Sequence, residues 1–224
     1  MAIERFKEIV EQVVLLPVRI RHRSRARPKH RARAQAIATT RHTLAGARGL
    51  NAHAIQTVFN VGLFVLLLDQ DLADFTDDMV GAIGDRRRRF VAKHEAVLLY
   101  EAAEDLPQLL GREFREATAA LGASSDQRQR LNDASAGLNQ FWREHREFLG
   151  DIRKALAAHR EHDALQYVEK LDALGPLEVM RLAAEFSGHL GQLVAVLTDV
   201  AGLTAGMPAL LKDMRSTATK GQTG

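Results

Sequence analysis

The sequence predicts an all-α protein, an antiparallel helical bundle with a basic N-terminal arm. Three observations lead to this prediction. Apolar residues recur every three or four positions over most of the 224 residues, which is the period of an amphipathic helix. No run of alternating β-branched residues is present, so nothing indicates a strand. The long amphipathic stretches are separated by short breaks, an order typical of antiparallel bundles.

Length and composition limit the class of protein. A chain of 224 residues can bury a sizeable core, and the absence of cysteine excludes disulfides and a thiol nucleophile. We expect residues 1–34 to form an amphipathic helix and an arginine-rich arm, residues 35–205 the helical bundle, and residues 206–224 a flexible tail. The N-terminus lacks the continuous apolar stretch of a secretory signal, which favours a cytoplasmic location, with peripheral membrane association left open.

The N-terminal third is expected to alternate between helical and extended segments. Residues 3–16 have an apolar stripe and a charged one, which predicts a helix that Pro17 ends or kinks. Residues 19–33 hold eight cations that repel one another, so we expect an extended or mobile arm. Residues 34–68 favour a helix, and the acidic residues 69–85 a short separate one.

The remaining two thirds give clearer helical patterns. Residues 86–121 predict one helix, kinked or interrupted at Pro107, which Gly122 can end with a positive φ angle. Ser124 and Gln127 have the spacing of a capping box and start a helix that reaches about residue 162.

The chain is expected to end in two more helices and a frayed end. A shorter helix over residues 165–174 ends at a Gly-Pro break. The last helix covers residues 177–203, and residues 212–224 look frayed. The apolar runs 58–68 and 190–211 are too short or too interrupted to cross a membrane. We expect both to be core, with contacts between copies in an oligomeric scaffold as the alternative.

Charge is distributed unevenly along the chain. Residues 1–50 hold twelve lysines and arginines against three glutamates, whereas the other 174 residues have a net charge of −6. The cations of the arm are Arg19, Arg21, Arg23, Arg25, Arg27, Lys29, Arg31 and Arg33. They predict either an anionic partner or an arm lying on the acidic surface of the protein itself.

Two anionic partners fit the basic arm. A nucleic acid would be held through its phosphates, but the arm has no aromatic residue to stack on bases. An anionic membrane surface would be held by the cations and by the amphipathic helix before them, the two terms that peripheral anchoring needs. The membrane is therefore slightly favoured. A second basic cluster, residues 86–89, is expected to form an exposed turn facing the acidic residues 69–78.

The sequence offers little for a metal or a cofactor, and we predict neither. Glu-x-x-His is absent, and after His94 the position that would complete His-Glu-x-x-His is Leu98. His159, His162 and Asp163 lie close enough on one helix to share an ion but lack a fourth ligand. His145 lies on an apolar stripe, which favours a hydrogen-bonded core residue. No phosphate loop or nucleophile elbow is present, and no small-molecule substrate is indicated.

One segment, residues 148–163, resembles the late helix of HEPN domains. Arg153 is followed after five residues by His159, which matches the family's Arg and His spacing. HEPN domains are small helical bundles, many of them dimeric ribonucleases of toxin–antitoxin and phage-defence systems. The resemblance implies that His159 would handle the proton of the 2′-hydroxyl or of the leaving oxygen, and that Arg153 would stabilise charge on the phosphate.

Three functional hypotheses follow from these patterns. The first is a non-enzymatic interaction module that engages an anionic surface through the basic arm. The second is a HEPN-like, metal-independent endoribonuclease that uses Arg153 and His159. The third is a homo-oligomeric scaffold joined through apolar helix faces. The membrane hypothesis requires the first helix to leave apolar side chains exposed, a requirement that can be compared with a structure.

Overall fold

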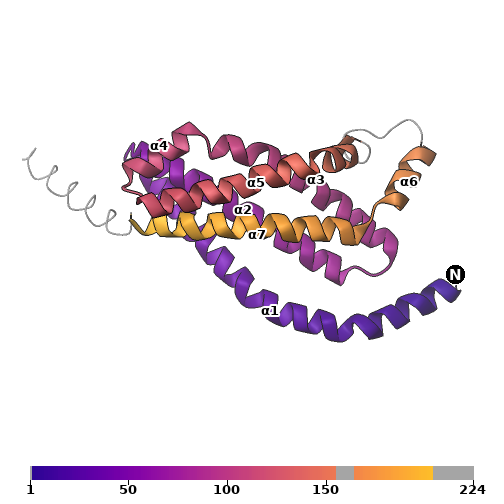
Figure 1. Cartoon of the computed structure of the whole chain (residues 1–224). Coiled ribbons are helices and arrows are strands. Elements are labelled where there is room, and N and C mark those ends of the chain that lie inside the picture. The colour runs from indigo at the N-terminus through magenta and orange to yellow at the C-terminus, as the bar shows by residue number, and fades with distance from the viewer. Residues whose placement is uncertain (1, 155–163, 204–224) are drawn as a thin grey trace, which may run out of the picture.

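The computed structural model describes residues 2–154 and 164–203 (Figure 1). Every regular element of this part of the chain is helical, which confirms the all-α prediction. The described helices are α1 (Ala2–Gly49), α2 (His53–Gly81), α3 (Asp85–Leu109), α4 (Arg112–Ala120), α5 (Ser125–Ile152), α6 (Ala164–Ala173) and α7 (Pro176–Leu203). The tail predicted over residues 206–224 lies outside the described residues.

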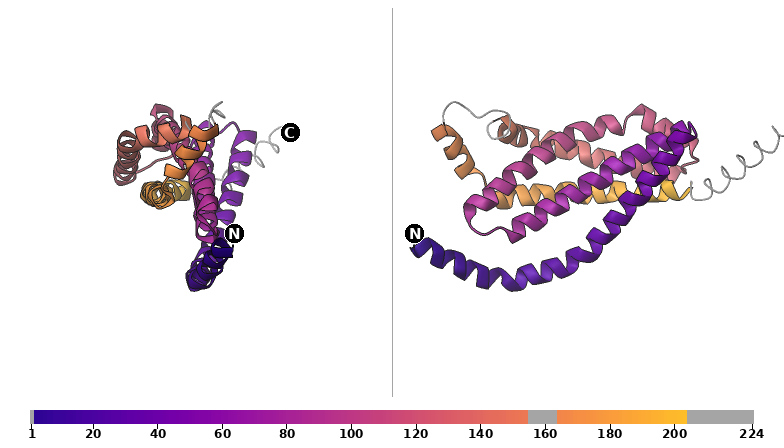
Figure 2. Two further views of the ribbon diagram at one scale, coloured as in Figure 1. Left: turned by 90° about the vertical axis from the view of Figure 1, so that its right-hand side faces the viewer. Right: turned by 180° about the vertical axis from the view of Figure 1, so that it is seen from behind.

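The long helices α2, α3, α5 and α7 run side by side as a bundle, and α1 bows outward along one side of it (Figures 1 and 2). Contacts show that α5 and α7 are antiparallel, since Arg130 near the start of α5 pairs with Asp199 near the end of α7. Further along α5, His145 pairs with Glu185 in the first half of α7. The antiparallel arrangement was predicted from the short breaks between helices.

The first helix corrects the sequence prediction. A single helix, α1, runs from Ala2 to Gly49 through Pro17 and Pro28, so the extended arm expected over residues 19–33 is wrong. Both prolines are on the exposed side of α1, where the carbonyl groups left without a helical donor can face water. Contacts with α2 hold the segment helical despite the charge repulsion between its arginines.

Two other boundaries differ from the prediction. The acidic residues 69–81 continue α2 and form no separate helix. The single helix expected over residues 86–121 is two helices, α3 and α4, which separate at Leu110 and Gly111, directly after the turn that contains Pro107.

Several local predictions are confirmed. Gly122 has a positive φ of 85°. The capping box is present, because the Ser124 hydroxyl accepts from the backbone of Gln127 and the Gln127 side chain accepts from the backbone of Ser124. The break at Gly175 separates α6 from α7. Helix α5 ends at Ile152, and residues 155–163 of the longer helix predicted there lie outside the described residues.

The core lies mainly between α2, α3, α5 and α7, and Leu44 of α1 and Phe114 of α4 are buried in it too. Its largest side chains are fully buried, and Phe141 of α5 packs against Phe186 of α7 with ring centroids 5.0 Å apart. Both apolar runs contribute to it: Val58, Val65, Leu190 and Leu193 are buried within this chain. None of the helices in the described residues combines the length and apolarity needed to cross a membrane.

Candidate functional site

One side of α1 docks on α2 through polar side chains. These side chains recur every three or four positions, the spacing of one face of a helix, and we call them the docked face: Arg19, His22, His30 and Arg33. Between them lies Ala26, which is partly buried. The partners on α2 are mostly aspartates. Over this face, the segment predicted to be a basic arm lies on the protein's own acidic surface.

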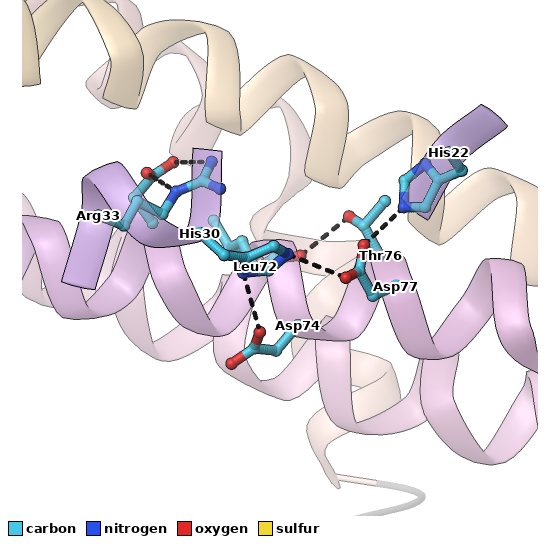
Figure 3. Close-up of polar contacts among 8 residues, drawn as sticks. His22, His30, Arg33, Leu72, Asp74, Thr76 and Asp77 are labelled. Carbon is cyan, nitrogen blue, oxygen red and sulfur yellow. Dashed lines mark hydrogen bonds and ion pairs between the residues drawn. The ribbon is translucent and has the colours of Figure 1, made fainter. Parts of the chain in front are cut away.

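A cluster of two histidines and two aspartates occupies the centre of the docked face (Figure 3). The Asp77 carboxylate forms a hydrogen bond with each imidazole. His22 Nε2 lies 2.5 Å from Oδ1, and His30 Nε2 lies 2.9 Å from Oδ2. The other ring nitrogen of His30 is 3.6 Å from Asp74. One carboxylate thus holds two points of α1 that lie about two helical turns apart.

Arginines hold the two ends of the same face. Arg33 forms a forked contact with the Asp69 carboxylate. Arg19 is buried and donates to the carbonyl oxygens of Val80 and Ala82 at 3.0 and 3.1 Å. These carbonyls lie at the C-terminal end of α2, where the helix dipole favours a cation. Near the N-terminal end of α1, Glu11 pairs with Arg88 of α3.

The rest of α1 exposes a different set of side chains, which we call the outer surface. Its first part is apolar and highly exposed, as shown by Val13 at 66% and Val14 at 65% of the maximum. The apolar members are Val10, Val13, Val14, Leu16, Val18 and Ile20. Its second part is basic, and its exposed members are Arg21, Arg23, Arg25, Arg27, Lys29 and Arg31. Apolar and basic side chains therefore follow one another along the same helix.

The eight predicted cations thus fall into two groups. Six are on the outer surface, and Arg19 and Arg33 are on the docked face. Sequence reasoning missed His22 and His30 as functional side chains because the alternating arginines hid the helical period. The available signal was the spacing of Arg19, His22, Ala26 and His30, which repeats at three and four residues.

The contacts of Arg88 and Arg89 in the second basic cluster go to residues other than 69–78. Arg88 pairs with Glu11 of α1 and with Asp85, and Arg89 pairs with Asp172 of α6 at 2.6 Å. These arginines join the start of α3 to its neighbours, while α1 takes the place facing the acidic part of α2.

The HEPN-like residues are described only in part. Arg153 follows α5 directly, 3.8 Å from the Glu101 carboxylate and 5.0 Å from the centre of the Tyr100 ring. His159, His162 and Asp163 lie outside the described residues, so the structure does not place them against Arg153.

One carboxyl group in the core has an unusual environment. Glu95 of α3 is fully buried, and neither of its side-chain oxygens has a hydrogen-bond partner. Burial raises the pKa of Glu95 to about 7, because desolvation disfavours the charged form. On α2, partial burial and then the neighbouring Asp74 carboxylate raise the pKa of Asp71.

Three comparisons of the chain with known proteins found no match. No protein-family model matches the chain, and neither the curated proteins nor the solved structures contain a significant match. The class established for the protein is therefore that of its fold, an all-α helical bundle. The resemblance to HEPN domains stays a prediction.

Proposed function

We propose that the protein is a peripheral membrane-binding module that attaches to anionic lipid surfaces through the outer surface of α1. The observation that carries this proposal is the sequence of exposed groups on one continuous helix, with six apolar side chains followed directly by six cations. An interfacial helix needs both kinds of group, since the apolar ones enter the acyl boundary and the cations meet lipid phosphates.

Magnitudes support a two-part attachment. Each lysine or arginine near an anionic leaflet contributes about 1 kcal/mol, an effect that salt screens within roughly 10 Å. Burial of apolar surface contributes about 25 cal/mol per Å², an effect that salt does not screen. Either term alone gives weak binding, while the two together give stable but reversible attachment.

The exposed valines favour a membrane over a nucleic acid. Val13, Val14 and Val18 are each more than half exposed, and a phosphate backbone offers them nothing to pack against. Cations that bind only nucleic acid need no apolar neighbours of this kind. A lipid surface uses both groups at once.

Co-sedimentation with vesicles across a salt series tests the proposal. Vesicles containing phosphatidylserine should bind the full chain, and vesicles of phosphatidylcholine alone should bind it far more weakly. Replacing Arg21, Arg23 and Arg25 by Gln should weaken binding roughly a hundredfold at low salt, from about 1 kcal/mol per cation. The matched control replaces Arg112, Arg128 and Arg146, which are exposed on α4 and α5, and should leave binding unchanged.

A second variant separates the two terms. Val13→Asn with Val14→Asn should leave binding at low salt but abolish the binding that persists at moderate salt. Duplex DNA and RNA are titrated in parallel. Binding to nucleic acid but not to vesicles, with the valine variant indistinguishable from wild type, would overturn the proposal. RNA cleavage lost in His159→Ala would instead establish the HEPN-like activity.

A further inference from the structure

A group of three potential metal ligands lies between α5 and α7, on helices other than α1. Glu144 and His145 come from α5 and Glu185 comes from α7, and one ligand atom of each lies within 4.8 Å of the others. Two of these residues are 40 positions apart in the chain. Local spacing rules applied to the sequence therefore did not reveal the group.

Core packing determines the positions of these ligands. The ring of His145 lies 4.7 Å from that of Phe141, one turn earlier on α5. Phe141 in turn packs against Phe186, the residue that follows Glu185 on α7. Because both phenylalanines are fully buried, they fix the register of the two helices and bring His145 opposite Glu185.

A second close contact supports the same register. A Cβ atom at Gly137 of α5 would lie only 2.4 Å from the His189 ring of α7, so glycine allows this approach. The ligand group therefore lies at the end of a closely packed stretch of α5 and α7, next to Phe141 and Phe186. Such rigid support is what a metal site requires.

The distance between His145 and Glu185 suits a shared ion better than a shared proton. His145 Nε2 lies 3.4 Å from Glu185 Oε1, which is long for an N–H···O hydrogen bond of about 2.7–3.2 Å. Zinc bonds of about 2.0–2.1 Å in a tetrahedron separate neighbouring ligand atoms by about 3.3–3.4 Å. Two of the three ligands thus already have the separation of a tetrahedral edge.

Charge and orientation agree with this interpretation. In the part of the chain that the structure describes, neither Glu144 nor Glu185 forms an ion pair with an arginine or a lysine. Gln140 donates to one carboxylate oxygen of Glu144 at 2.8 Å, which leaves the second oxygen for an ion. Hydrogen bonds of this kind orient metal ligands.

The geometry points to a binding site for a divalent transition-metal ion, best matched by zinc, formed by Glu144, His145 and Glu185. One imidazole and two carboxylates neutralise the ion and leave a fourth position for water. The ion would join α5 to α7 on the bundle surface. This site is independent of the membrane function proposed for α1.

Isothermal titration of the chelator-treated full chain with zinc chloride tests the site, and thermal unfolding is followed in parallel. Wild-type protein should bind one zinc ion saturably in the micromolar range and melt at a higher temperature with zinc present. Glu185→Gln keeps the shape of the side chain and should weaken binding at least tenfold. His145→Ala should weaken it as much, and His42→Ala on the exposed surface of α1 is the matched control.

The zinc titrations of the variants distinguish a metal site on α5 and α7 from its absence. Loss of zinc binding in both Glu185→Gln and His145→Ala, with His42→Ala unchanged, supports the site. Glu185→Gln remains informative even if His145→Ala disturbs the packing on Phe141. No saturable zinc binding at 100-fold excess over protein, or equal binding by wild type and Glu185→Gln, would overturn the proposal.

Discussion

The two helix pairs α1–α2 and α5–α7 are both antiparallel but are held by different forces. Between α1 and α2 the central contacts are polar and partly exposed, formed by His22 and His30 on Asp77. Between α5 and α7 the central contact is the fully buried pair Phe141 and Phe186. The first contact is the weaker one, because partly exposed ion pairs contribute little and buried aromatic packing contributes much.

This difference separates the scaffold of the protein from its candidate binding element. Helices α2, α3, α5 and α7 share one apolar core and should unfold together. The C-terminal end of α1 joins this core through Leu44 and Ala47. The part of α1 before them is attached along its docked face and exposes its outer surface, so it should open locally at a lower free energy. Substitutions in the shared core should therefore change global stability more than substitutions in the docked face.

Truncation of the aromatic core should have the largest effect. Phe141→Ala removes a fully buried ring that contacts Phe186 and His145, and it should lower the free energy of unfolding by about 3–5 kcal/mol. Urea denaturation followed by circular dichroism measures this. Leu67→Ala is the control, since Leu67 is 45% exposed and its loss should cost far less. Equal effects at the two positions would contradict the packing described for the core.

The buried carboxyl group should make stability depend on pH. Burial raises the pKa of Glu95 from 4.5 to about 7, so the folded state keeps its proton at pH values where the unfolded state has lost it. The free energy of unfolding should therefore fall as pH rises from about 4.5 to 7.

Glu95→Gln removes this titration without changing the shape of the side chain. The variant should be more stable than wild type by about 2 kcal/mol at pH 8, and its stability should change less between pH 4.5 and 7. Urea denaturation at several pH values measures both effects. A variant less stable than wild type at pH 8 would show that Glu95 is paired in the folded protein.

Loss of the cap of α5 should have a smaller effect on the whole bundle. Ser124→Ala removes the hydroxyl that accepts from Gln127 and should destabilise the protein by about 1 kcal/mol. Because α5 belongs to the shared core, the change should appear in global unfolding. Ser125→Ala is a neighbouring control with no capping role and should leave the midpoint unchanged.

A change in the docked face should have the smallest effect on global unfolding. Asp77→Asn removes the charged acceptor of His22 and His30, whose contribution is below about 1 kcal/mol because all three side chains are partly exposed. Hydrogen exchange should become several times faster over residues 19–33 and stay unchanged in α7. Asp105→Asn, at an exposed position of α3, is the control. Equal acceleration of hydrogen exchange in α1 and α7 would show that α1 unfolds with the core.

The sequence predicted the bundle better than it predicted the first helix. The apolar period, the capping box at Ser124 and the break at Gly175 are local signals, and the helices they predicted are present. The continuous α1 depends on contacts with Asp69 and Asp77, which lie 36 to 55 residues away in the chain. Local propensity carries no information about such contacts. The prolines and the arginine repeat therefore led to the prediction of an extended arm.

The candidate site was predicted in composition but not in arrangement. The basic residues were identified from charge alone, yet their division between two faces requires the helix and its partner. Val13 and Val14 were read as the apolar stripe of a helix, and only the fold shows that they are exposed. The proposed metal ligands His145 and Glu185 lie 40 residues apart in the chain, on α5 and α7, so no local motif can contain both.

Insertion of the valines into lipid, on which the proposed membrane attachment depends, can be measured directly. The chain has no cysteine, so Val14→Cys can carry a single environment-sensitive fluorophore, with labelled Asn132→Cys on the exposed face of α5 as control. On vesicles containing phosphatidylserine, we expect a blue shift at position 14 and none at position 132. Binding to these vesicles with no shift at position 14, or with equal shifts at both positions, would contradict insertion.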